Sequence, residues 1–241
     1  MGAAELRAAS QALRAQWDRL RPWLRDVVDD DAAAHPSVLD GWSVADLVAH
    51  VGRAMDALTA CSPLPAGTVP LSLGEYLGTY AGRAAEIAET TRTLAAQVAG
   101  DPLRWADEQA AAAFARLDAL GPSDLVVQAR RGPVLLSTMT TSRVVELVVH
   151  ADDLWRSVRR IPGAGPGEDP VDREALAFVA GALLTLVHER GGWDLEVDDA
   201  RAWVRLATGR ESYDVDLLAR ALRPRYTSDA VPDLGRVLPL L

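Results

Sequence analysis

The chain contains no lysine, so all 25 of its basic residues are arginines. A lysine amine is needed at the phosphates of a P-loop, in Schiff-base catalysis and for the attachment of pyridoxal phosphate. The sequence therefore excludes these three kinds of chemistry.

Cysteine is nearly as scarce, with Cys61 as the single thiol in 241 residues. An intrachain disulfide is impossible, which excludes a secreted scaffold held together by disulfides. No histidine lies near Cys61 in the sequence to activate its thiol. We therefore expect a passive side chain and not a nucleophile.

Long apolar runs and a targeting segment are also missing. No stretch reaches the roughly 18 apolar residues needed to span a bilayer. Glu5 and Arg7 precede any apolar run, which is unlike a signal peptide. We expect a cytoplasmic protein without membrane contacts.

The net charge of −9 and the pI near 4.9 disfavour binding to nucleic acid. The expected partner is instead a small-molecule substrate. We expect the protein to be a monomer or a homodimer.

Apolar residues recur at helical spacing through most of the first 160 residues. This periodicity predicts helices over residues 4–32, 43–60, 72–99, 103–120 and 140–159. Pro22 is expected to kink or split the first of them. The pairs Ser43 with Asp46 and Ser72 with Glu75 are typical of capping boxes and predict where two helices begin. The first part of the chain is thus predicted to be a helical bundle.

The segment 161–170, IPGAGPGEDP, is the strongest interruption of this pattern, with three prolines and three glycines. It is predicted to link a helical domain over 1–160 to a second domain over 171–241. The second domain is expected to contain helices at 171–189 and 214–222 and a strand at 203–208. The predicted fold class is therefore mainly α, with a small α+β C-terminal domain.

Glu146 and His150 are the first candidates for chemistry. They lie four residues apart on a predicted helix, so both side chains project from one face, and Asp153 continues that face. A solvated polar stripe with an ion pair between Arg143 and Glu146 would show the same spacing.

His50 borders the apolar face of the second helix, so we expect it to be at least half buried. A core histidine bonded to a backbone carbonyl or to Asp46 is one explanation of this position. If the two helices face each other, however, His50, Glu146 and His150 form a set of two histidines and one carboxylate. Such a set suits a divalent metal, typically zinc, and leaves a coordination position open.

The segments LDGWSVADLVAHVG (39–52) and TSRVVELVVHADDLW (141–155) resemble the mycothiol-dependent maleylpyruvate isomerase family, within the DinB-like metal-binding four-helix bundles. The family motifs are Trp-Ser/Thr-Val…His at the start of the second helix and Glu-x-x-x-His on the last. They match Trp42, Ser43, Val44 and His50, then Glu146 and His150. The resemblance implies a DinB-like four-helix bundle in the first domain. It also implies a zinc ion held by His50, Glu146 and His150.

The resemblance further implies mycothiol as a thiol cofactor, whose sulfur the zinc would bind and deprotonate. The implied activity is isomerisation or S-conjugation of a small electrophile, either an enedione or an unsaturated acid. Asp153 would orient a metal ligand, or else pair with an arginine. Arg83 would bind a substrate carboxylate, or else form a surface salt bridge. Two other functions remain open, namely a metal-dependent hydrolase that uses no thiol and a non-catalytic bundle that binds a metal or ligand.

Overall fold

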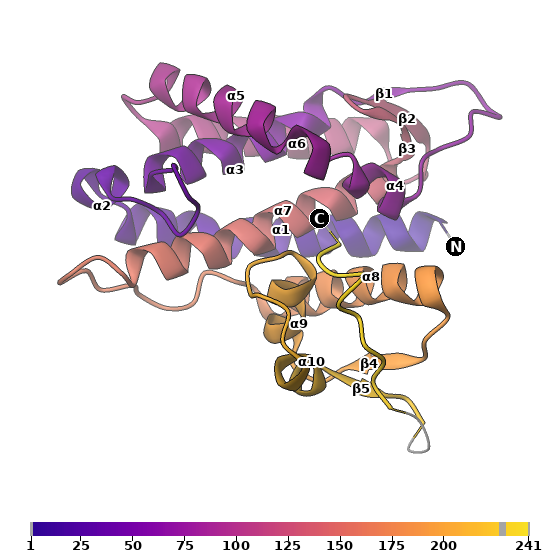
Figure 1. Cartoon of the computed structure of the whole chain (residues 1–241). Helices are drawn as coiled ribbons and strands as arrows, with labels where there is room; N and C mark the ends of the chain where they lie inside the picture. Colours follow the sequence, from indigo (N-terminus) through magenta and orange to yellow (C-terminus); the bar gives the residue numbers. More distant parts are fainter. Residues whose placement is uncertain (1, 227–229, 241) are drawn as a thin grey trace.

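The computed structural model describes residues 2–226 and 230–240, which are mainly helical (Figure 1). Its centre is a bundle of the four helices α1 (Gly2–Val27), α3 (Val44–Thr59), α6 (Pro102–Leu120) and α7 (Leu136–Val158). α1 packs along α7, α3 packs along α6, and α3 also contacts α7. The predicted four-helix bundle is thus confirmed. No helix within the described residues is long and apolar enough to cross a membrane.

Two of the predicted helices differ from the structure in their extent. α1 continues through Pro22 without interruption and ends at Val27, and the short helix α2 (Asp30–Ala34) follows separately behind its N-cap Asp29. The helix predicted over 72–99 is divided into α4 (Leu73–Gly78), the single-turn 3-10 helix η1 (Ala81–Arg83) and α5 (Ala84–Gln97). Glycines on either side of Tyr80 weaken the helix there. The division matters because it carries Tyr80 toward the bundle.

A small antiparallel sheet covers one end of the bundle. It contains β1 (Ser62–Pro63), β2 (Val126–Ala129) and β3 (Gly132–Leu135), in the order β1-β2-β3. β2 and β3 form a hairpin whose two-residue turn is Arg130-Arg131. Gly132 follows the turn with φ at +128°, a backbone conformation that residues other than glycine rarely adopt.

The C-terminal part is small and mixed. It contains α8 (Arg173–Gly191), β4 (Leu195–Val197), α9 (Ala200–Ala207), α10 (Val215–Ala221) and β5 (Leu222–Pro224), with β4 and β5 antiparallel. α8 packs against α1 and α7, so the apolar side chains of this part and of the bundle form one continuous core. The division into 1–160 and 171–241 stays a prediction. Residues 1, 227–229 and 241 of those ranges lie outside the described residues.

The strand predicted at 203–208 is wrong, because these residues belong to α9 and its C-cap. The carboxylate of Asp199 accepts hydrogen bonds from two backbone N–H groups and caps this helix. Trp203, Leu206 and Ala207 then fall on one buried face at helical spacing. The strands of this part are β4 and β5 instead.

Gly52 allows helices α3 and α6 of the bundle to approach closely. A Cβ at this position would overlap the Trp105 ring and lie 3.0 Å from Cα of Ala106 on α6. We therefore expect Gly52→Ala to force α3 away from α6 and to lower the free energy of unfolding by about 1–3 kcal/mol. Chemical denaturation followed by circular dichroism measures this change.

Gly181 provides the matched control, since it lies within α8 and a Cβ there would meet nothing within 4 Å. Gly181→Ala is expected to raise the free energy of unfolding by about 0.5–1 kcal/mol through helix propensity alone. Equal effects of the two substitutions would contradict the close packing of α3 on α6.

Candidate metal centre

The position of His50 is set by the start of α3. The Ser43 hydroxyl accepts a hydrogen bond from the N–H of Asp46, and the Asp46 carboxylate accepts one from the N–H of Ser43 at 2.8 Å. This capping box fixes where the helix begins. The Trp42 ring then lies edge-on to the imidazole of His50, with ring centroids 5.2 Å apart.

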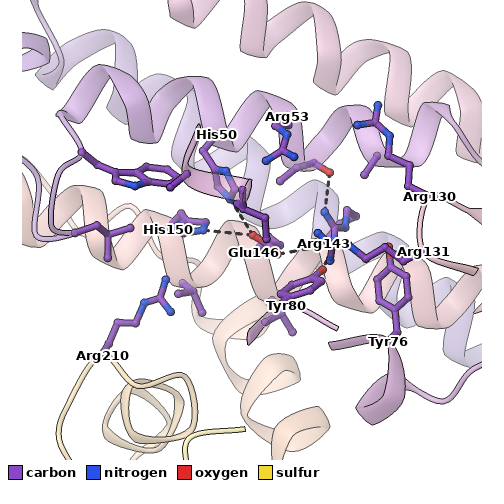
Figure 2. A pocket seen from close by; sticks show the side chains of 18 residues that line it. His50, Arg53, Tyr76, Tyr80, Arg130, Arg131, Arg143, Glu146, His150 and Arg210 are labelled. Atoms are coloured by element: carbon purple, nitrogen blue, oxygen red, sulfur yellow. Dashed lines mark hydrogen bonds and ion pairs between the residues drawn. The ribbon is translucent and has the colours of Figure 1, made fainter. Parts of the chain in front are cut away.

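Helices α3 and α7 bring His50, Glu146 and His150 together (Figure 2). Oε2 of Glu146 lies 3.3 Å from Nε2 of His50 and 3.3 Å from Nε2 of His150. One ligand atom from each residue lies within 4.8 Å of the other two. The polar face of α7 is not a solvated stripe, because Arg143, His150 and Asp153 on it are all buried.

Both imidazoles also have a partner on their far side. Nδ1 of His50 lies 3.2 Å from the hydroxyl of Thr91, which is on α5. Nδ1 of His150 lies 3.0 Å from the carboxylate of Asp153. Hydrogen bonds at Nδ1 orient an imidazole and leave Nε2 available as a ligand. Asp153 also accepts from Arg210 at 3.1 Å, so the two contacts expected for Asp153 as alternatives occur together.

Burial and charge act against each other on these residues. Burial lowers the pKa of His50 to about 4, so this imidazole is neutral near pH 7. Burial also lowers the pKa of His150, but hydrogen bonds with Asp153 and Glu146 exceed that effect and the net change is a rise. Burial raises the pKa of Glu146, but hydrogen bonds from both histidines and the charge of Arg143 hold it well below its usual range. Glu146 is therefore ionised.

This set of donors fits a zinc ion. Two imidazole Nε2 atoms and one ionised carboxylate face a common point from two helices, and both Nδ1 atoms have hydrogen-bond partners. Three protein ligands with one position left open are typical of catalytic zinc sites.

The three residues form part of the wall of a pocket of about 460 Å³. Trp42, Tyr76 and Tyr80 line it with aromatic rings, and Ile87 and Ala88 of α5 cover it. The remaining polar lining consists of the arginines Arg53, Arg130, Arg131, Arg143 and Arg210. Figure 2 shows Arg210 on one side of the His–Glu–His cluster and the other four on the opposite side.

Arg83 and Cys61 lie apart from this pocket. The guanidinium of Arg83 is exposed and forms a two-pronged pair with Glu86, and Arg83 is not among the residues that line the pocket. Cys61 is buried, and burial raises the pKa of its thiol to about 11. The S–H group donates to the carbonyl of Ala57 at 3.6 Å. The passive role expected for Cys61 agrees with these surroundings.

Residues 13–155 match the family model described as the mycothiol maleylpyruvate isomerase N-terminal domain. The chain belongs to this family. The matched residues of this family member include His50, Glu146 and His150. Arg210 lies beyond the matched residues. Neither the curated proteins nor the solved structures gave a match.

Several residues of the candidate metal centre and its pocket belong to no motif in the sequence. Among the described side chains of α5, only that of Thr91 is buried. Helical spacing places it on one face with Ile87 and Leu94, but nothing in the sequence shows that this face meets His50. Tyr80 and Arg131 reach the pocket from a helix break and a hairpin turn. Their roles depend on which loops converge, and only the tertiary structure shows that.

Thr91 provides a test of how His50 is oriented. Thr91→Val keeps the shape of the side chain but removes the hydroxyl that contacts Nδ1 of His50. We expect zinc affinity to fall by about 10- to 100-fold, measured by competition with a chromophoric chelator. Thr90→Val is the control, because the Thr90 hydroxyl donates only to a carbonyl of its own helix and the residue is exposed. Equal zinc affinities in the two variants would contradict an orienting role for Thr91.

Proposed function

We propose that the protein is a zinc-dependent enzyme that uses mycothiol as its thiol cofactor. It would isomerise or S-conjugate a small electrophile, either an enedione or an unsaturated acid. The observation that carries the proposal is the placement of Glu146 Oε2 at 3.3 Å from both Nε2 atoms, in the wall of the pocket. Membership of the mycothiol maleylpyruvate isomerase family supports the choice of thiol.

His50, Glu146 and His150 would hold the metal, with Thr91 and Asp153 keeping the two imidazoles in position. When bound there, zinc lowers the pKa of a coordinated thiol, so that mycothiol is available as a thiolate at neutral pH. Both histidines are buried, so water has little access to this part of the pocket.

Arg143 orients two groups of the pocket at once. Its Nη2 donates to the Tyr80 hydroxyl at 2.5 Å and lies 3.9 Å from Oε1 of Glu146. Burial raises the pKa of Tyr80, so the hydroxyl keeps its proton. Because this oxygen accepts from Arg143, its own O–H is available as a donor. We assign to Tyr80 a hydrogen bond to an oxygen atom of the substrate.

The proposal is tested by the dependence of activity on thiol. The zinc-loaded protein is assayed with maleylpyruvate for isomerisation and with monochlorobimane for conjugation, with and without mycothiol. Turnover that requires mycothiol is expected with one of these probes. Turnover at the same rate without any thiol would contradict the proposal and favour hydrolysis.

Substitution of one ligand tests the link between the metal and the activity. His150→Ala removes one of three ligands, so we expect loss of both stoichiometric zinc and thiol-dependent turnover. Cys61→Ser should leave both unchanged, because the reactive sulfur belongs to the cofactor. Zinc is measured by elemental analysis and folding by circular dichroism. Full activity in His150→Ala, or inactivity in a zinc-loaded Cys61→Ser protein, would contradict the proposal.

A further inference from the structure

The arginines of the pocket differ in how their charge is compensated. Three of them have a carboxylate nearby: Arg130 pairs with Asp56, Arg143 with Glu146 and Arg210 with Asp153. Arg53 and Arg131 form no ion pair with any described residue. Within the described part of the chain, the guanidinium of Arg53 donates only to the neutral hydroxyl of Thr91, at 3.4 Å.

Arg131 is held in place without its hydrogen-bonding capacity being used. It occupies the turn between β2 and β3, and its guanidinium lies over the Tyr80 ring at 4.0 Å from the centroid. Its Nη1 is buried and has no hydrogen-bond partner within residues 2–226 and 230–240. A buried donor of a charged group without a partner is costly, so its presence points to a ligand.

The two guanidiniums also share one region of positive charge. Arg53 and Arg131 line the same pocket, and Figure 2 shows both on the side of the His–Glu–His cluster opposite Arg210. Burial lowers the pKa of Arg53, and the positive charges of Arg130 and Arg131 lower it further. Two carboxylates also act on Arg53. Glu146 already interacts with two histidines and Arg143, and Glu86 is exposed and paired with Arg83. The whole protein carries a net charge of −9, so this end of the pocket differs in sign from the molecule around it.

We propose that Arg131 and Arg53 form an anion-binding subsite that takes a carboxylate of the pocket's substrate. A guanidinium presents parallel N–H donors that match the two oxygens of a carboxylate. Contacts run without a break from Arg131 over Tyr80 to Arg143 and then to Glu146. A short acid bound at Arg131 would therefore lie along Tyr80 with its other end toward the His–Glu–His cluster. The inference rests on the proposed function, because it names a group of that substrate.

The test is a calorimetric titration of the zinc-loaded protein with maleate. Dimethyl maleate has the same carbon skeleton without charge, and inorganic phosphate tests for a general anion site. We expect maleate to bind and the diester and phosphate to bind at least tenfold more weakly. Arg131→Gln and Arg53→Gln should each weaken maleate binding by about 10- to 100-fold, the range for loss of a charged hydrogen bond.

Arg92→Gln is the control, because Arg92 is an exposed arginine of α5 that pairs with Glu89 and lies outside the pocket lining. It should bind maleate as the unsubstituted protein does. Zinc content and circular dichroism are recorded for every variant, so that loss of the metal or of the fold is seen directly.

Several results would overturn the subsite. They are absence of maleate binding, equal binding of the diester or of phosphate, and affinity unchanged in both Arg131→Gln and Arg53→Gln. The last result would mean that maleate binds at the metal instead. Maleate binding that depends on Arg131, in a protein without thiol-dependent turnover, would count against the proposed function and leave the subsite intact. Thiol-dependent turnover together with maleate binding that does not depend on Arg131 or Arg53 would count against the subsite and leave the proposed function intact.

Discussion

A carboxylate held between two buried imidazoles is the interaction on which the rest of this structure depends. Glu146 lies on α7 and contacts histidines of both α3 and α7, away from most solvent. A buried charge destabilises a protein unless its surroundings compensate it. Here the compensation comes from the histidines themselves and from Arg143 beside them. The pairing also links α3 to α7, because displacement of either helix would separate His50 from the carboxylate.

Several segments outside the four main helices contribute to this centre. α5 has one buried side chain among those described, Thr91, and it contacts His50. The β2–β3 hairpin brings Arg131 into the pocket from its turn. The C-terminal part contributes Arg210, which pairs with Asp153 behind His150. Short segments that would have little stability alone are thus packed where they orient a ligand residue or line the pocket.

The sequence predicted the parts of the molecule that have periodicity or a local motif. Helical spacing predicted the bundle, and the Ser43–Asp46 pair predicted the start of α3. The two spaced motifs named His50, Glu146 and His150, which the structure brings together, and their role as metal ligands stays a prediction. The strand expected at 203–208 was wrong because Asp199 caps a helix there. Thr91 and Arg131 were not predicted, since nothing local in a sequence shows which exposed helix or turn meets a distant pocket.

X-ray absorption spectroscopy of the zinc-loaded protein, before and after mycothiol is added, tests the central claim most directly. Before addition, the account predicts only nitrogen and oxygen neighbours of zinc, at about 2.0–2.2 Å. After addition, it predicts one sulfur neighbour at about 2.3 Å. A zinc environment that mycothiol leaves unchanged would contradict the account. A sulfur neighbour present before any thiol is added would contradict it as well, since it would place Cys61 at the metal.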